Sequence, residues 1–136
     1  MISYLRGFSI LVLFFAQTTN AMPCDTGYMC KSKSGKYRIE LTRCRYTNRL
    51  ELLSVQMDHK DVKEATLGPA YDGRSVGGNV LAFEIDLPTT DDAVRILMVE
   101  ISGKDSSGRI TEQHAESEPA RMSVVHEEPI SCEIEE

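Results

Sequence analysis

Few side chains in this sequence have the type and spacing that catalysis or metal binding requires. The three histidines, His59, His114 and His126, are far apart in the chain, and none belongs to a metal-binding pair. We expect them at the surface. Asp91 and Asp92 fall in a turn, where solvent keeps carboxylates ionised and poorly suited to acid catalysis. The sequence therefore predicts a protein that is not an enzyme and that needs no metal ion or cofactor.

Four cysteines offer a different chemistry, the formation of disulfide bonds. Cys24, Cys30, Cys44 and Cys132 are an even number, and their spacing does not match the Cys-x-x-Cys pairs of zinc sites. We therefore expect two disulfides, formed in an oxidising compartment. Four cysteines permit three pairings. The pairing that we predict joins Cys24 to Cys30 as a local clip and Cys44 to Cys132 as a long-range bond.

Residues suited to partner binding occur together in a segment rich in glycine. Tyr71, Asp72 and Arg74 place an aromatic ring, an acid and a base within residues 68–78, where the glycines and Pro69 predict a long loop. Binding residues are often found on loops that a rigid scaffold holds in place. A recognition loop is one interpretation of this segment, and an ordinary connecting loop is the other.

A second candidate for partner binding is the basic stretch that contains Lys31, Lys33 and Lys36. Residues 22–50 carry seven positive and two negative side chains, whereas residues 51–136 carry seven positive and 19 negative ones. The three lysines are therefore a candidate face for a polyanion. The alternative interpretation is that the acidic C-terminal arm lies beside this basic hairpin.

The N-terminus has the three-part layout of a secretory signal peptide, which we assign to residues 1–21. Arg6 supplies the positive charge, residues 8–16 the apolar region and Ala21 the small residue before the cleavage site. The apolar region is too short for a membrane span, which needs about 20 residues. Cleavage leaves residues 22–136, which we expect to be secreted without membrane insertion.

Length and charge narrow the class of protein further. The chain has 136 residues, of which 41% are hydrophobic and 26% are charged. These values predict a single folded domain over residues 22–136, and they exclude a disordered or multi-span membrane protein. The formal net charge of −6 argues against a nucleic-acid partner, because binding to nucleic acids requires a basic surface.

Alternating apolar and polar residues predict strands along most of the chain after the signal peptide. The expected strands are residues 36–42, 50–57, 79–87, 93–101, 109–112 and 120–126. Only residues 62–67 are compatible with a helical turn. Many short strands separated by turns are typical of a compact antiparallel β-sandwich or a small barrel. We therefore predict an all-β fold of this kind, stapled by two disulfides.

Four strands carry more detailed predictions about burial. The apolar residues that alternate in the first and third expected strands should face inward: Tyr37, Ile39, Leu41, Leu81, Phe83, Ile85 and Leu87. Leu53, Val55 and Met57 alternate with polar residues and should face the core. Residues 93–101 form a nearly continuous apolar run, which is typical of a central strand that is covered on both faces.

The last expected strand predicts a mode of partner binding. Residues 120–126 lie between Pro119 and Pro129, and proline is found in sheets mainly at their edges. We therefore expect an edge strand. Such an edge can bind a partner by the addition of an extended segment to the sheet.

The layout of the chain resembles the small secreted cysteine-containing proteins that are counted among the effector candidates of plant- and insect-associated fungi. The signal peptide, the even number of cysteines and the strands at 37–41 and 81–87 carry this resemblance. Some proteins of this type are small β-sandwiches that bind host proteins or cell-wall glycans. The resemblance implies a secreted, effector-like binding module with a role in virulence, which acts on a host or extracellular partner protein. A glycan-binding module and a secreted protease inhibitor, with residues 68–78 as its inhibitory loop, are the alternatives.

Overall fold

The structure is a computed structural model that describes residues 24–44, 49–73, 80–89, 93–102, 106–117 and 120–135. The predicted signal peptide, residues 1–21, lies outside these segments. The described residues form nine β-strands and no helix, which confirms the all-β prediction. Among them there is accordingly no helix with the length and apolar character needed to cross a membrane.

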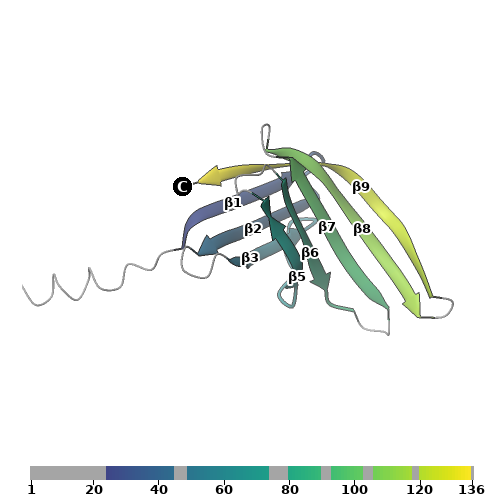
Figure 1. The fold of residues 1–136 in the computed structure, drawn as a ribbon. Coiled ribbons are helices and arrows are strands. Elements are labelled where there is room, and N and C mark those ends of the chain that lie inside the picture. Colours follow the sequence, from purple (N-terminus) through teal and green to yellow (C-terminus); the bar gives the residue numbers. More distant parts are fainter. Residues whose placement is uncertain are drawn as a thin grey trace, which may run out of the picture.

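The strands are labelled in chain order in Figure 1. They are β1 (Cys24–Ser32), β2 (Tyr37–Cys44), β3 (Arg49–Met57), β4 (Lys60–Asp61), β5 (Thr66–Asp72), β6 (Val80–Leu87), β7 (Val94–Ser102), β8 (Ser107–Ser117) and β9 (Ala120–Glu135). The six strands expected from the sequence correspond to β2, β3, β6, β7, β8 and β9. Of these, β8 and β9 are much longer than expected because they pair with each other along the whole length of β8.

All nine strands belong to one antiparallel sheet with the strand order β4-β3-β2-β1-β9-β8-β7-β6-β5. Strands that follow each other in the chain are neighbours in the sheet, with one exception: β4 and β5 lie at its two ends. In addition, the first strand of the chain, β1, pairs with the last one, β9. The sheet curls into a half-barrel in which β3 comes into contact with β5 (Figure 1). A sandwich requires two sheets, so that alternative is wrong, and the half-barrel is closer to the other alternative, a small barrel. One strongly twisted sheet encloses the core.

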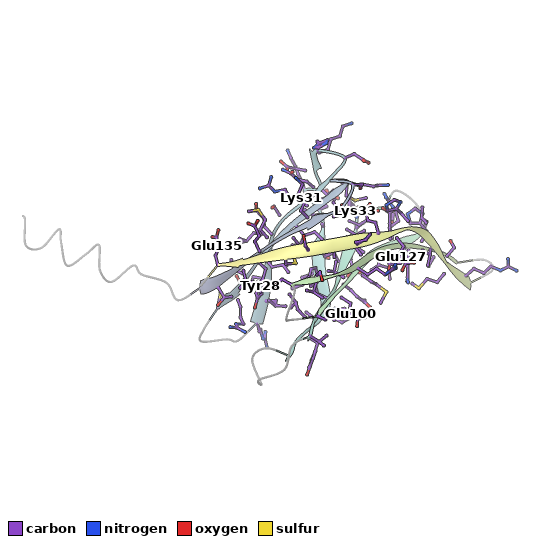
Figure 2. All side chains as sticks on the ribbon, turned by 90° about the horizontal axis from the view of Figure 1, so that it is seen from above. Tyr28, Lys31, Lys33, Glu100, Glu127 and Glu135 are labelled. Carbon is purple, nitrogen blue, oxygen red and sulfur yellow. A yellow bond between two sulfur atoms is a disulfide. The ribbon has the colours of Figure 1, made fainter. Side chains whose placement is uncertain are left out.

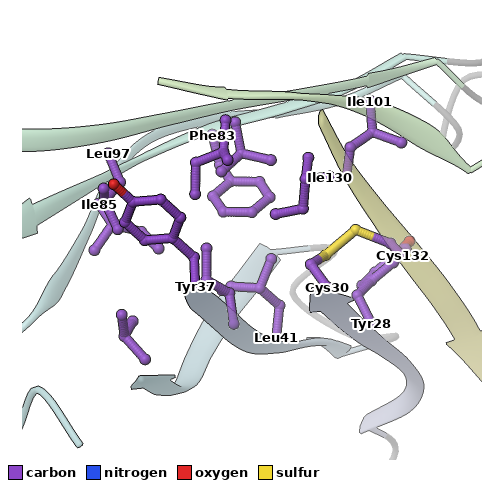
Figure 3. Close-up of a cluster of buried hydrophobic side chains, with 14 of the residues drawn as sticks. Tyr28, Cys30, Tyr37, Leu41, Phe83, Ile85, Leu97, Ile101, Ile130 and Cys132 are labelled. Carbon is purple, nitrogen blue, oxygen red and sulfur yellow. A yellow bond between two sulfur atoms is a disulfide. The ribbon is translucent and has the colours of Figure 1, made fainter. Parts of the chain in front are cut away.

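The concave face of the half-barrel holds the hydrophobic core (Figure 3). Alternate side chains of a strand share a face, so an apolar residue at every second position gives one apolar face. The side chains that were expected to face inward from β2 and β6 are buried: Tyr37, Ile39, Leu41, Leu81, Phe83, Ile85 and Leu87. The predictions for these two strands are therefore confirmed.

The predicted inward face of β3 is only partly correct. Val55 is buried and Met57 packs against the core, but 60% of Leu53 is exposed. The register between β2 and β3 shifts beside Leu53, which is the extra residue of a β-bulge. A one-residue bulge reverses the alternation, so that Leu50 and Leu52 pack against the core on the other side of it.

β7 is covered mainly on one face, although Ile96 on its outer face is only 9% exposed. Leu97, Val99 and Ile101 are buried, whereas Met98 and Val94 keep 38% and 49% of their surface exposed on the outer face. The expectation of a strand covered on both faces is therefore wrong. The outer face of β7 is largely uncovered because the described strands make one sheet, and no second layer packs against the outer side of that sheet.

The long loop expected at residues 68–78 is a strand over its first part. Residues 68–72 belong to β5, which pairs with β6 at the end of the sheet. Gly68 and Pro69 lie where the β5–β6 register shifts, and an end strand tolerates a proline at such a bulge. Residues 62–67 do not form a helical turn, and residues 74–79 lie outside the described segments.

One disulfide bond joins Cys30 of β1 to Cys132 of β9 (Figure 3). This bond excludes both predicted pairs, Cys24 with Cys30 and Cys44 with Cys132. The two bonded residues are register partners in the β1–β9 pair, which the sequence did not reveal because β1 was not expected. The bond joins the first and last strands of the chain, which are neighbours in the sheet, across a sequence separation of 102 residues.

Candidate functional site

Four titratable side chains meet on the concave face, where β8 and β9 pair. Glu112 and His114 occupy alternate positions of β8, and His126 and Glu128 occupy alternate positions of β9. Glu112 is the register partner of His126, so all four side chains project to the same side of the sheet. Only 3% of Glu112 and 8% of Glu128 are exposed. We call these four residues the Glu–His cluster.

Glu112 is held by groups from two other strands. The Tyr37 hydroxyl of β2 donates a hydrogen bond to Glu112 Oε1 at 2.9 Å, and a guanidinium nitrogen of Arg95 in β7 lies 3.6 Å from Oε2. Burial alone would raise the pKa of Glu112, but the hydrogen bonds with Tyr37 and His114 and the charge of Arg95 lower it. Burial and the bond to Glu112 raise the pKa of the Tyr37 hydroxyl. At neutral pH the carboxylate is therefore ionised and the phenol is neutral.

His114 lies between an acid and a base. Its Nε2 is 3.0 Å from Glu112 Oε2 and 3.0 Å from Arg95 Nε. With a proton on Nε2, the ring donates to Glu112; without that proton, Nε2 accepts a hydrogen bond from Arg95. One nitrogen cannot make both bonds at once, so the tautomer of the ring decides which neighbour Nε2 of His114 binds.

Glu128 fastens the turn between β1 and β2 to β9. The backbone N–H of Ser34 donates to Glu128 Oε1 at 2.7 Å, and the Ser34 hydroxyl donates to Oε2 at 2.7 Å. His126 Nε2 lies 2.5 Å from the same Oε2. Burial alone would raise the pKa of Glu128, but the hydrogen bonds from the Ser34 hydroxyl and backbone N–H outweigh it and lower the pKa to about 2.

The Glu–His cluster is better suited to holding strands together than to proton transfer. A general acid needs a carboxyl group that keeps its proton near neutral pH, whereas the pKa values of Glu112 and Glu128 are both lowered. Within the described residues, no group of His, Cys, Asp and Glu side chains is arranged to hold a metal ion. The cluster connects β8 to β2 and β7, and it connects β9 to the β1–β2 turn.

A second feature is a strand edge without a neighbour. β9 pairs with β8 from Ala120 to Ser131, but with β1 only from Ile130 to Glu135. In the part of the chain that the structure describes, residues 121–128 therefore have no strand on their other side. Figure 1 shows the two ends of β9 beside different strands. The edge expected at residues 120–126 is therefore confirmed for this part of β9, although β9 as a whole lies between β1 and β8 in the sheet. We call residues 121–128 the free edge.

The backbone of the free edge presents hydrogen-bonding groups to solvent. Where the free edge ends, the Lys33 N–H donates to the Pro129 carbonyl at 2.9 Å, so the backbone of Pro129 points away from β8. Backbone N–H and C=O groups lie in the plane of the sheet and point toward one of the two edges of a strand. Residues whose side chains share a face direct these groups toward the same edge. Met122, Val124 and Glu127 share the outer face with Pro129, because their register partners are alternate residues of β8. Their N–H and C=O groups therefore point outward from the edge.

Apolar side chains lie beside the free edge on the outer face. Met122 and Val124 are each 56% exposed, and Val125, the extra residue of a β-bulge, is 51% exposed. Val94 and Met98 of β7 are exposed on the same outer face. Single exposed apolar residues are ordinary, but three together on one strand edge, with two more on β7 across the intervening β8, are typical of an interaction surface. We call these five residues the apolar edge patch.

The third feature is a groove of about 420 Å³ on the outer face of β5 to β8, which we call the outer groove. Tyr71 of β5 lines one end of it, and its side chain is 59% exposed. Of the other residues predicted with Tyr71 to bind a partner, Asp72 is the last residue of β5, and Arg74 lies outside the described segments. The structure therefore places Tyr71 in a candidate site.

The three lysines of the basic stretch do not share one site. Lys31 and Lys33 are exposed at the end of β1 and in the turn that follows (Figure 2). Lys36 is half-buried, and its Nζ lies 5.5 Å from the centre of the Tyr37 ring. Because Lys31 is the register partner of Ser131, the acidic C-terminal arm lies beside the basic first hairpin. That interpretation of the charge pattern is confirmed.

The Glu–His cluster was not expected from the sequence. His114 and His126 were expected at the surface, but each side chain is only 35–36% exposed and contacts a buried carboxylate. The available signal was the spacing, since an acid and a histidine two positions apart in a strand share a face. This spacing carried no prediction because the expected strand, residues 109–112, ended at Glu112 and did not include His114. His59 does lie outside the site, in the tight β3–β4 turn with a φ of 66°.

Comparisons of the chain with models of protein families, with curated proteins and with solved structures found no match. Function is therefore argued from three features of the molecule: the Glu–His cluster on the concave face, the free edge of β9 and the outer groove. The first stabilises the fold, and the other two face solvent.

Proposed function

We propose that the chain is a secreted, non-enzymatic binding module of the effector type, which binds a host or extracellular partner protein at the free edge. The observation that carries this proposal is the stretch 121–128 of β9, which has no neighbouring strand on one side within the described residues. An extended segment of a partner can add to such an edge, where backbone hydrogen bonds supply affinity and neighbouring side chains supply specificity.

The side chains of the free edge support a binding role. Soluble proteins usually protect exposed edges with charged residues, prolines or short strands, because a bare edge aggregates. Here the middle of the edge, from Met122 to Val125, carries no charge and exposes three apolar side chains. An edge of this kind is typical of a surface that another chain covers.

Secretion and a second disulfide belong to the same proposal. The bond between Cys30 and Cys132 is compatible with an oxidising compartment, as expected for an exported protein. Cys24 and Cys44 are register partners at the far end of the β1–β2 pair. We therefore propose that they form the second of the two bonds that the even number of cysteines predicts.

A glycan remains the second candidate ligand because Tyr71 lies exposed in the outer groove, and sugars pack against aromatic rings. The protease-inhibitor alternative has less support. It was based on a loop at residues 68–78, and residues 68–72 belong instead to the paired strand β5.

Selection of random peptides on the oxidised protein, residues 22–136, tests the strand-addition proposal. We expect the selected peptides to alternate apolar and polar residues, and to protect the amides of Met122, Val124 and Glu127 from hydrogen exchange. These three N–H groups point outward from the edge, so they exchange readily in the free protein.

Two variants of one residue provide the control for this experiment. Val124→Pro removes an outward-pointing N–H and should weaken peptide binding by about tenfold or more. Val124→Thr keeps that N–H and should bind much like the wild type. Should Val124→Pro fail to fold, Val124→Lys keeps the backbone and places a charge on the edge instead. The proposal is overturned if the folded edge variants bind as well as Val124→Thr, or if the protected amides lie elsewhere.

A further inference from the structure

The outer groove is hollow because a small side chain lies between two large ones. Ala82 of β6 is the register partner of both Tyr71 in β5 and Glu100 in β7. Partners that lie directly opposite share a face, so the tyrosine ring and the carboxylate flank the methyl group of Ala82. All three residues line the groove. Its volume of about 420 Å³ lies within the range of ligand-binding clefts.

The Tyr71 ring lies close to a glycine that leaves room for it. A Cβ atom placed on Gly73 would lie 3.0 Å from Tyr71 Cε1 and 2.9 Å from the Val80 carbonyl oxygen. The ring therefore lies against the backbone of Gly73, which has no side chain to displace it. The exposed ring offers an aromatic surface to a ligand in the groove.

The groove has an excess of negative charge. Glu84 and Glu100 line it, and neither forms an ion pair within the described part of the chain. Arg109 also lines the groove, but its Nε lies 2.9 Å from Glu127 Oε1 of β9. Glu100 and Glu127 are labelled in Figure 2. Arg109 is also the register partner of Glu100, so the two carboxylates and one guanidinium that line the groove leave it with an excess of one negative charge.

We propose that the outer groove binds a lysine or arginine side chain from a basic segment of the partner. This inference rests on the proposed function, because it takes the ligand to be a protein. Carboxylates attract ammonium and guanidinium groups, and the face of a tyrosine ring attracts the same cations. Residues 51–136 carry 19 negative and only seven positive side chains, and this imbalance also steers basic partners toward this part of the molecule.

The groove and the free edge form one continuous surface. Met98 lines the groove and also belongs to the apolar edge patch. Gln113 lines the groove and is the register partner of Val124 on the free edge. A partner segment that adds to β9 and then turns across the outer face can therefore place a basic residue in the groove.

Titration of the ¹⁵N-labelled oxidised protein, residues 22–136, with a hexalysine peptide tests this inference. We expect the peptide to shift the amide signals of Tyr71, Glu84 and Glu100, and hexaglutamate to leave them unchanged. Glu100→Gln should weaken hexalysine binding by about fivefold to tenfold, and Tyr71→Ala by a similar factor. Glu133→Gln is the matched control, because it removes the same charge from an exposed position of β9 outside the groove.

Three results would overturn the inference. Equal weakening by Glu133→Gln and Glu100→Gln would mean diffuse attraction to an acidic surface. Shifts of the same amides by chitohexaose and not by hexalysine would make the groove a glycan site. No shift with either probe would leave the groove without a ligand of these classes. Val124→Pro separates the two proposals, because it should abolish binding of edge-selected peptides and leave hexalysine binding in the groove unchanged.

Discussion

The Tyr37 hydroxyl of β2 donates a hydrogen bond to the Glu112 carboxylate of β8 at 2.9 Å, although β1 and β9 separate these two strands in the sheet. The bond therefore crosses the interior of the half-barrel. Tyr37 is completely buried and Glu112 is 3% exposed, so water cannot readily replace either partner. The bond holds the two walls of the curled sheet at a fixed separation.

Replacement of Tyr37 by phenylalanine should show how much this bond contributes. Tyr37→Phe keeps the ring and leaves a buried, ionised Glu112 with one donor fewer, which should lower the free energy of unfolding by about 1–3 kcal/mol. Urea unfolding at pH 7 measures the loss. In a Glu112→Gln background the same substitution should cost less, because the charge that needs the donor is gone. An unchanged unfolding free energy in Tyr37→Phe would show that the bond contributes nothing.

Stability should fall in acid because of Glu128. Its pKa is lowered from 4.5 to about 2 in the folded protein by hydrogen bonds from Ser34 that outweigh the effect of burial. The unfolded chain therefore takes up the proton first as pH falls. The contribution of Glu128 is complete above about pH 4.5 and is lost progressively toward pH 2; a shift of this size corresponds to about 3 kcal/mol.

Urea unfolding between pH 2 and pH 7 checks this dependence. Glu128→Gln should be less stable than the wild type at pH 7, and its stability should change less with pH below 4.5. Ser34→Ala removes the hydroxyl donor but keeps the backbone one, so its pH profile should lie between the two. Identical acid profiles for Glu128→Gln and the wild type would assign the acid sensitivity to other carboxylates.

The amino-acid pattern predicts β2 and β6 well because their buried positions are all apolar and alternate regularly. β1 has the same alternation of buried positions, at Thr26, Tyr28, Cys30 and Ser32, but two of these residues are polar. A pattern based on hydrophobicity alone does not detect such a strand. Without β1, the pairing of Cys30 with Cys132 had no structural basis, and a local bond from Cys24 looked simpler.

The candidate sites differ in how far local sequence determines them. The free edge was expected from the prolines on either side of residues 120–126, which is local information. The outer groove depends on Tyr71, Ala82 and Glu100 meeting in register across three strands. Registers of this kind are set by bulges and strand ends rather than by local composition, so the groove could not be predicted.

The pairing of the cysteines predicts unequal effects of their removal. In the chain-entropy model, loss of the bond between Cys30 and Cys132, which are 102 residues apart, should cost about 5 kcal/mol. The double variant Cys30→Ser/Cys132→Ser should therefore unfold at a much lower temperature. Loss of the proposed bond between Cys24 and Cys44 should cost about 3 kcal/mol, because it closes a shorter loop. A peptide linked through Cys44 and Cys132 in a non-reduced digest would contradict this pairing.

Gly108 should be far less tolerant of substitution than Gly27, although both lie in strands. A Cβ atom on Gly108 would lie 1.8 Å from the Glu100 carbonyl oxygen and 2.7 Å from the Ile101 Cα, and these are backbone atoms that cannot move independently. Gly108→Ala should therefore lower the unfolding free energy by about 3 kcal/mol or more. On Gly27 the nearest atom would be Glu135 Cβ at 4.0 Å, so Gly27→Ala should be neutral or stabilise by up to about 1 kcal/mol. Thermal melting of both variants tests the contrast, and equal melting temperatures would contradict the close approach of β7 and β8 at Gly108.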